Sequence, residues 1–177
     1  VVTTYREKFG HVKALWAGIH AAAVVAVADG DAAFQRIRWF TEGRFLYAAL
    51  PSGRRLAYAD PELQSVRTPW GLTQAQLTYN GVLPLTHQWG RQRTYGGMLV
   101  ENVVQAIARD IMAEAMVQCE ESGRYEIVLS VHDEIVAEGD PARTSVEEFE
   151  SLVTQVPSWA AGCPITAEAW SGFRYRK

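Results

Sequence analysis

Apolar residues recur at the three- and four-residue spacing of an amphipathic helix in three stretches of the chain. These stretches cover about 4–29, 98–119 and 145–156. The first is stopped by Asp29-Gly30 and the third ends before Pro157. Capping-box pairs, in which Ser or Thr is followed three residues later by Glu, begin the first and third stretches: Thr4 with Glu7, and Ser145 with Glu148. The sequence therefore predicts three helices.

Two other stretches have the pattern of β-hairpins. One joins 44–50 to 55–58 through Pro51-Ser52-Gly53, residues that favour chain reversal. The other joins the β-branched run 125–131 to a return strand at 136–138 through a polar tip, His132-Asp133-Glu134.

The remaining stretches are less regular. We expect irregular structure over 34–40 and a long irregular excursion over 60–96, where Pro and Gly are frequent, with one strand at about 77–82. A further strand is expected at 164–170. The overall prediction is an α+β fold: a small antiparallel sheet containing the 125–138 hairpin and the C-terminal strand, backed by the second and third helices.

Composition is that of one globular unit, because 177 residues with 48% hydrophobic content suffice for a core. The two cysteines are too few for a disulfide framework and fit a reducing compartment. The first residues show no charged leader before an apolar core, and the apolar run 21–28 is shorter than the roughly 20 residues that span a bilayer. We therefore expect a soluble protein without a membrane partner.

Charge is distributed unevenly along the chain, although the formal net charge is only -3. Residues 1–110 hold 12 Lys and Arg against 8 Asp and Glu, whereas residues 111–177 hold 5 against 12. A basic part beside an acidic part suggests a polyanion near the first and a cation near the second. Ordinary fluctuation along the chain is the alternative.

The turn of the second hairpin carries the most specific chemistry. His132, Asp133 and Glu134 lie between apolar runs, so two carboxylates are held at a rigid tip. Mg²⁺ prefers oxygen ligands in fixed octahedral geometry, and such a tip can supply some of them. An Asp that only forms the turn is the structural alternative.

Two further groups of residues suit nucleic acid. Basic and aromatic residues alternate over 87–95, including Arg91, Arg93 and Tyr95, a composition suited to phosphates and stacked bases. On the second helix, Asn102 and Gln105 lie on a polar stripe and can donate hydrogen bonds to minor-groove acceptors. A solvated polar surface explains each group equally well.

The order of several sequence blocks resembles the C-terminal part of a family A DNA polymerase, most closely the phage-encoded branch. The resemblance covers nearly the whole chain, and the order and spacing of the blocks are more specific than the His-Asp-Glu triplet alone. The blocks are Tyr5–Trp16, Thr94–Ala106, Val131–Val136, Pro164–Trp170 and Arg174–Lys177.

The resemblance assigns roles to individual residues. Asp133 is implied as a carboxylate that binds metal, with Glu134 as its acidic neighbour, and His132 would approach the primer terminus. Gln105 matches the glutamine that family members use against the minor groove of the new base pair. Asn102 lies three residues before it, where many relatives have asparagine four before, so it is expected only as a neighbour of the DNA.

The resemblance also implies a domain arrangement. Residues 1–96 would contribute a fingers-side helix, hairpin and excursion, and residues 97–177 would contribute palm-side structure: a helix, the His-Asp-Glu hairpin, another helix and a strand. The palm-type sheet would contain the hairpin. Because a strand of the parent sheet would come from elsewhere, exposed surfaces could promote self-association.

The implied reaction is the attack of a primer 3′-hydroxyl on a deoxynucleoside triphosphate, with two Mg²⁺ ions as cofactors and primer-template DNA as partner. No first metal motif and no triphosphate-binding Lys helix occur between Val1 and Lys177. We therefore expect the isolated chain to be inactive and the complete enzyme to act in the cytoplasm of a bacterium, encoded by a phage or prophage. The alternatives are a non-catalytic nucleic-acid-binding remnant and a metal-dependent nuclease that uses the tip carboxylates with Glu138 or Glu168.

Overall fold

The computed structural model describes residues 8–67, 71 and 73–175. They form two compact units, which we call the sheet unit (Val1–Ala106) and the ribbon unit (Ile107–Lys177). The expected boundary lay between residues 96 and 97, at the start of a helix, whereas the units meet within that helix. The Thr4 and Glu7 capping box lies outside the described residues.

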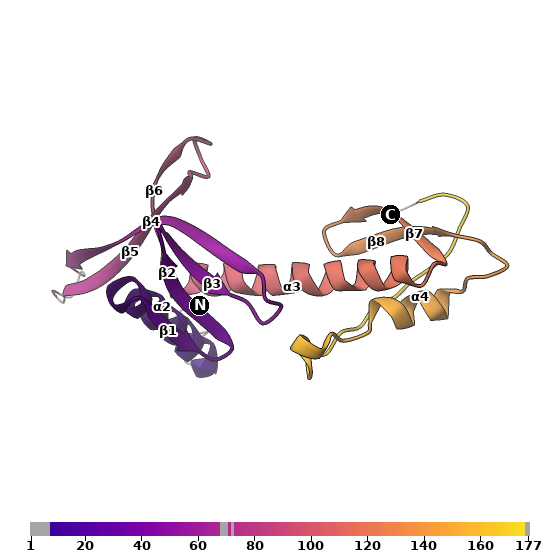
Figure 1. Cartoon of the computed structure of the whole chain (residues 1–177), viewed down its shortest axis with the longest axis horizontal. Helices are drawn as coiled ribbons and strands as arrows, with labels where there is room; N and C mark the ends of the chain where they lie inside the picture. The colour runs from indigo at the N-terminus through magenta and orange to yellow at the C-terminus, as the bar shows by residue number, and fades with distance from the viewer. Residues whose placement is uncertain (1–7, 68–70, 72, 176–177) are drawn as a thin grey trace. The chain divides into compact units, whose positions relative to one another are not determined.

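The sheet unit contains a six-stranded antiparallel meander in which each strand pairs with its neighbours in sequence (Figure 1). Consecutive antiparallel strands need only short connections, so the order β1 to β6 follows the chain. The strands are β1 (Asp31–Phe34), β2 (Ile37–Glu42), β3 (Phe45–Ala49), β4 (Arg55–Arg67), β5 (Thr73–Val82) and β6 (Trp89–Arg93).

Helix α2 (Gly10–Asp29) covers one face of β1 and β2 (Figure 1). Its buried residues are Ile19, Ala22, Ala23 and Ala26, and the sheet contributes the buried side chains of Trp39, Leu46 and Tyr58, among others. The helix ends as expected at Gly30, whose φ of 96° is the left-handed conformation that glycine adopts readily.

Helix α2 is also long and apolar enough to cross a membrane by length and composition, alone among the helices that the structure describes. Core helices of soluble proteins meet the same criterion, and α2 packs on β1 and β2, although only 22% of its apolar window is buried. The absence of a membrane partner stays a prediction.

Two expectations of irregular structure were wrong. Residues 34–40 belong to a tight β1–β2 hairpin, with Gln35 at a φ of 56° in the turn. The described residues within 60–96 are mostly strand. Pro61 lies at the register shift between Ala59 and Glu62, where β4 is bulged and a missing N–H costs little. The predicted strand at 77–82 is the second half of β5.

Helix α3 (Gly96–Glu121) confirms the second predicted helix. Its start requires glycine, since a Cβ built on Gly96 would lie 2.1 Å from the carbonyl oxygen of Trp16 in α2. Leu99 and Val103 are buried in the sheet unit, and Ala115 and Cys119 are buried in the ribbon unit.

The ribbon unit contains the strands β7 (Tyr125–Val131) and β8 (Glu134–Gly139), which form the predicted antiparallel hairpin. Helix α4 (Val146–Val153) confirms the third predicted helix, and the Ser145 side chain accepts a hydrogen bond from the backbone N–H of Glu148, as the capping pair indicated. A short 3₁₀ turn, η1, covers Ser158–Ala160.

The expected C-terminal strand at 164–170 is absent from the described part of the chain, where these residues are irregular and mostly exposed. A strand needs a neighbouring ladder, but the backbone N–H of Ala169 instead donates to the carboxylate of Glu150 on α4, at 2.7 Å. The α+β composition with antiparallel sheets is as predicted. The assignment to a palm fold stays a prediction.

Candidate functional site

The His-Asp-Glu residues lie at the tip of the β7–β8 ribbon. Val131 and Glu134 are the last paired residues, so His132 and Asp133 form a two-residue turn. His132 has a φ of 54°, as the first central residue of a primed hairpin turn requires. This geometry matches the twist of the strands and presents both turn residues to solvent.

Glu134 has a partner from the end of the chain. The phenol of Tyr175 donates a hydrogen bond to Oε2 of Glu134 at 2.8 Å, across a separation of 41 residues. This hydrogen bond to the carboxylate raises the pKa of Tyr175 above its ordinary value. Local sequence around the turn gave no signal of this contact, although Tyr175 lies in one of the blocks that carry the resemblance.

The tip has oxygen donors of the kind that Mg²⁺ prefers, but it does not form a metal site by itself. The described residues contain no cluster of three or more His, Cys, Asp or Glu side chains that could hold a metal ion. Asp133 and Glu134 are adjacent in sequence, and an octahedral ion needs more ligands than they provide.

Glu138, the extra carboxylate of the nuclease alternative, is far from the tip. It lies four residues along β8 from Glu134, which is about 13 Å in an extended strand. Its partner across the ribbon is Glu126, another carboxylate. The geometry therefore does not support one ion shared by Glu134 and Glu138.

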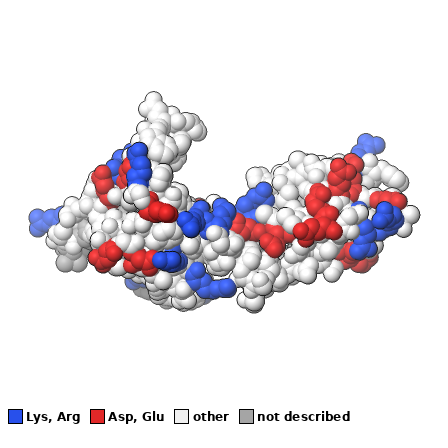
Figure 2. Space-filling model, viewed as in Figure 1, with Lys and Arg blue, Asp and Glu red and all other residues white. Residues whose placement is uncertain are grey.

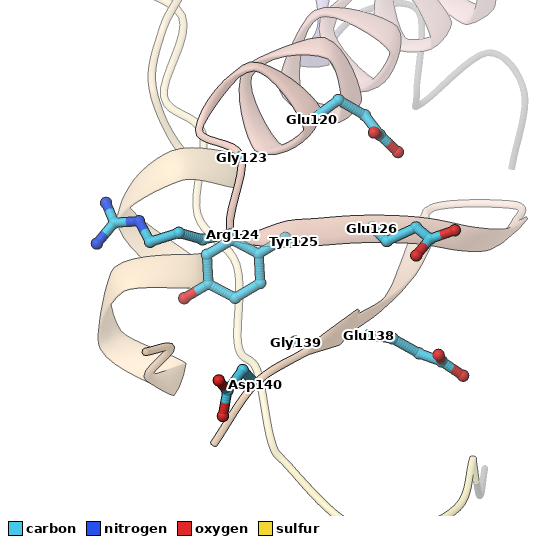
Figure 3. A pocket seen from close by; sticks show the side chains of 8 residues that line it. All are labelled: Glu120, Gly123, Arg124, Tyr125, Glu126, Glu138, Gly139 and Asp140. Atoms are coloured by element: carbon cyan, nitrogen blue, oxygen red, sulfur yellow. The ribbon is translucent and has the colours of Figure 1, made fainter. Parts of the chain in front are cut away.

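The base of the ribbon contains an acidic hollow of about 620 Å³ (Figure 3). Its carboxylates belong to Glu120, Glu126, Glu138 and Asp140, and Figure 3 shows the side chains of Glu126 and Glu138 pointing in the same direction. Glu120 already accepts a hydrogen bond from the backbone N–H of Ile127 at 2.7 Å. The hollow shares no lining residue with the tip.

Helix α4 is attached to the base of the ribbon by Tyr125. The Tyr125 hydroxyl donates to the backbone oxygen of Ser145 at 2.8 Å and lies 3.0 Å from Oε2 of Glu148. Arg124 forms an ion pair with Glu148. Burial is the largest cause that raises the pKa of Tyr125.

In the sheet unit, the basic and aromatic residues predicted to bind nucleic acid follow one side of β6. Alternation along the strand places Trp89, Arg91 and Arg93 on the same face, and β6 is an edge strand of the sheet. Trp89 is 66% exposed, and it is a candidate that the sequence analysis did not single out within 87–95. The sequence signal for Trp89 was its position two residues before Arg91, because residues two apart in a strand lie on the same face.

Arg91 is anchored within the sheet. Its guanidinium donates to the backbone oxygen of Asp60 at 2.5 Å and to Oε1 of Glu62 at 2.6 Å. Arg93 is exposed on the same strand, and Tyr95 is 62% exposed just before α3. Arg93 and Tyr95 therefore have the accessibility that a nucleic-acid contact requires, while Arg91 also has a structural role.

The two amides on α3 differ in their surroundings. Nδ2 of Asn102 donates to the hydroxyl of Tyr58 at 3.2 Å, in a partly buried contact, and burial raises the pKa of Tyr58 to about 12. Gln105 is exposed, and its Nε2 lies 3.3 Å from Oε1 of Glu101, one helical turn away. Gln105 can reach an external ligand, whereas the structure gives Asn102 an internal partner.

The surface visible in Figure 2 has basic and acidic side chains intermixed. Several arginines of the sheet unit are paired, including Arg38 with Asp31 and Arg44 with Asp60. The uneven charge of the two parts of the sequence therefore does not by itself mark a binding surface.

The chain is similar to a DNA polymerase of Bacillus phage SP02. The two are 36% identical over 179 residues, which cover this whole chain and 27% of that polymerase. The chain thus spans about a quarter of the length of this curated relative. No family model matches the chain, and no solved structure matches it. The similarity supports a relationship to phage DNA polymerases.

Proposed function

We propose that the chain is the C-terminal, palm-side and fingers-side portion of a family A DNA polymerase that extends a primer on a DNA template. The observation that carries the proposal is the similarity to a phage DNA polymerase along the whole chain. The His-Asp-Glu hairpin, whose turn exposes His132 and Asp133, agrees with the site that the sequence blocks imply.

In this proposal Asp133 binds catalytic metal together with carboxylates from the rest of the polymerase, and Glu134 supports it. Two Mg²⁺ ions, when bound, lower the pKa of the attacking hydroxyl and neutralise charge on the attacking and leaving oxygens. The rigid turn holds the Asp133 carboxylate at a fixed place, and His132 stands beside it toward the primer terminus. Gln105, Arg93 and Tyr95 contact the DNA, with Asn102 and Arg91 as structural neighbours.

The two units divide these roles between them. The residues proposed to contact metal lie in the ribbon unit, and those proposed to contact DNA lie in the sheet unit. Because the tip has too few ligands, we expect the isolated chain to be inactive in primer extension with Mg²⁺. Incorporation of nucleotides by the purified chain alone would contradict this expectation.

The test uses the complete polymerase that carries this chain, with Asp133 replaced by Ala. Loss of a metal ligand should lower the rate of single-turnover incorporation by several orders of magnitude and leave primer-template affinity nearly unchanged. Asp140→Asn is a matched control, because Asp140 is an exposed carboxylate at the base of the same hairpin. An unchanged rate in Asp133→Ala would refute the assignment of Asp133.

A second candidate function is nucleic-acid binding without catalysis, which the exposed Trp89 and Arg93 on an edge strand favour. It predicts DNA binding that weakens with salt and does not depend on Mg²⁺. Metal-independent binding combined with an inactive complete polymerase would favour this function over synthesis.

A further inference from the structure

One face of the six-stranded sheet carries a group of aromatic rings. Pairing between β2 and β3 places Phe40 directly opposite Tyr47, and Phe45 lies two residues away on the same face of β3. The centroids of Phe40 and Tyr47 are 5.4 Å apart with ring planes at 26°, and those of Phe45 and Tyr47 are 5.8 Å apart. All three rings are only partly buried.

Two guanidinium groups lie over the faces of these rings. Arg38 lies 5.3 Å from the centroid of Phe40, and Arg55 lies 5.2 Å from Phe40 and 5.8 Å from Tyr47. Their side chains are 65% and 54% exposed. We call these five residues the aromatic patch: Arg38, Phe40, Phe45, Tyr47 and Arg55.

The patch lies on the face of β2 and β3 opposite to the core. Trp39, Leu46 and Ala48 alternate with the patch residues and are fully buried, on the side covered by α2. The neighbours of the rings on the patch face are small, since Ala57 pairs with Tyr47 and Ala49 pairs with Arg38. Since the paired neighbours are small, a flat ligand can reach the ring faces when the exposed side chains of Arg38 and Arg55 move aside.

Partly exposed rings with mobile arginine side chains over them suit unpaired nucleobases, because each guanidinium can turn from the ring to a phosphate and leave the ring face to a base. Every base can stack on an aromatic side chain, and guanidinium groups bind phosphate. A duplex hides its base faces, so the ligand that fits is a single strand. We propose that the aromatic patch binds single-stranded nucleic acid, with bases stacked on Phe40 and Tyr47 and phosphates at Arg38 and Arg55.

The choice of this ligand rests on the proposed function, because a polymerase template has an unpaired strand ahead of the primer. The proposal extends that function to a surface that the sequence did not single out. It places a contact with single-stranded nucleic acid on β2, β3 and β4 of the sheet unit. The predicted DNA-binding residues lie on or next to other elements, the strand β6 and the helix α3.

The register of the sheet connects the patch to β6. Phe45 pairs with Ala59, Ala59 with Asn80, and Asn80 with Arg91. These residues form one row of the sheet, in which Ala59 is buried and Arg91 is exposed. The row spans three strand spacings from β3 to β6, about 14 Å.

The acidic neighbours of the arginines determine how binding depends on salt. Arg38 pairs with Asp31 at 2.5 Å, and Arg55 pairs with Glu42 at 3.4 Å. Exposed ion pairs contribute little, so a phosphate can replace each carboxylate. At most two phosphates are then bound at the patch, and stacking provides most of the affinity, so the affinity should fall only slowly as salt increases.

The test is a titration of the whole chain with fluorescein-labelled oligothymidine, followed by fluorescence anisotropy. Replacing Phe40 and Tyr47 together by Leu keeps apolar side chains and removes the stacking faces, so the affinity should fall about tenfold or more. Phe173→Leu removes a fully exposed ring elsewhere and should leave the affinity unchanged. Tyr47→Phe retains the ring and should retain the affinity.

The charged residues provide a second matched pair. Arg55→Ala should weaken binding more than Arg36→Ala, because Arg36 is an exposed arginine in the β1–β2 turn, outside the patch. A duplex of the same length should bind more weakly than the single strand. Oligonucleotides that contain iodouridine should crosslink to Phe40 or Tyr47, a readout that remains valid if the double Leu variant does not fold.

Wild-type affinity in a folded double Leu variant, or crosslinks confined to residues outside the patch, would overturn the proposal. Such a result would show that the rings only stabilise the sheet through cross-strand packing. Equal binding of duplex and single strand would overturn it as well. None of these outcomes depends on Asp133, so failure of the patch is distinguishable from failure of the polymerase assignment.

Discussion

The sheet unit and the ribbon unit differ in how deeply they bury their side chains. In the sheet unit, Trp39, Leu46 and Ala48 on neighbouring strands have no exposed surface, and α2 covers them. In the ribbon unit, β8 and α4 contain no buried residue, and Tyr125 is the only buried residue of β7. The proposed metal-binding tip thus lies on the more weakly packed unit.

This difference bears on function. A two-stranded hairpin is marginally stable by itself, so the position of Asp133 depends on the few contacts that hold the ribbon. These contacts include the Tyr125 hydroxyl at the base and the Tyr175 hydroxyl at the tip. The sheet unit, in contrast, can present its exposed rings and arginines from a rigid scaffold.

The largest expected effect is in the core of the sheet unit. Trp39→Ala should lower the free energy of unfolding by about 3–5 kcal/mol, because it leaves a cavity in a fully buried position. Urea unfolding measures this change, with Arg36→Ala as an exposed control in the preceding turn. A loss below about 1 kcal/mol would show that the sheet unit is not the better packed of the two.

A smaller loss is expected where α2 and α3 approach each other. Gly96→Ala would place a Cβ 2.1 Å from the backbone oxygen of Trp16, and a backbone atom cannot give way cheaply. We expect a destabilisation of about 1–3 kcal/mol, as in other overpacked sites. In Gly10→Ala the new Cβ meets no atom within 4 Å, so this variant should unfold at the same urea concentration as the wild type or at a slightly higher one. Equal stability of the two variants would rule out the close approach.

In the ribbon unit, Tyr125→Phe should cost about 0.5–1.5 kcal/mol, because it removes the hydroxyl that joins β7 to the start of α4. Hydrogen exchange followed by mass spectrometry should show faster exchange in β7, β8 and α4 only. Tyr95→Phe, at an exposed tyrosine, is the control. Faster exchange across β2 and β3 as well would contradict the separation into two units.

The smallest expected effect is on how the stability of the sheet unit changes at acidic pH. Arg44 holds the pKa of Asp60 down to about 2, helped by a hydrogen bond from Asn80. A lowered folded-state pKa adds stability above the ordinary value of about 4, and that stability is lost as the pH falls toward 2. Asp60→Asn should therefore reduce the difference in sheet-unit stability between pH 5 and about pH 2, measured by urea unfolding. An unchanged acid dependence would mean that the ion pair has no effect.

The sequence predicted the parts of the fold whose signals are local. The Ser145 capping pair, the stop at Gly30 and the reversal near His132 and Asp133 each depend on a few adjacent residues, and the structure confirms all three, although Glu134 belongs to β8 rather than to the turn. The strand β4 was missed because Pro61 marks a bulge rather than a loop. The strand expected at 164–170 was wrong because strand patterning does not reveal whether a neighbouring ladder is available.

For the candidate site, too, local features could be predicted from the sequence and long-range contacts could not. The tip residues could be chosen from the sequence because the hairpin is contiguous, whereas the contact of Tyr175 with Glu134 joins residues far apart in the chain. The aromatic patch depends on the register between strands, which places Phe40 beside Tyr47. No spacing rule along the sequence could have shown that register before the hairpins were known.

The central claim is that Asp133, at the tip of the ribbon, binds catalytic metal in a DNA polymerase. The most direct test measures single-turnover nucleotide incorporation by the complete polymerase as Mg²⁺ is varied, in Asp133→Asn and in Glu138→Gln. Both variants remove one negative charge from the same ribbon, but only Asp133 lies at the tip. The account predicts a loss of several orders of magnitude for Asp133→Asn and a nearly normal rate and Mg²⁺ dependence for Glu138→Gln. Equal rates in the two variants, or a larger loss for Glu138→Gln, would contradict it.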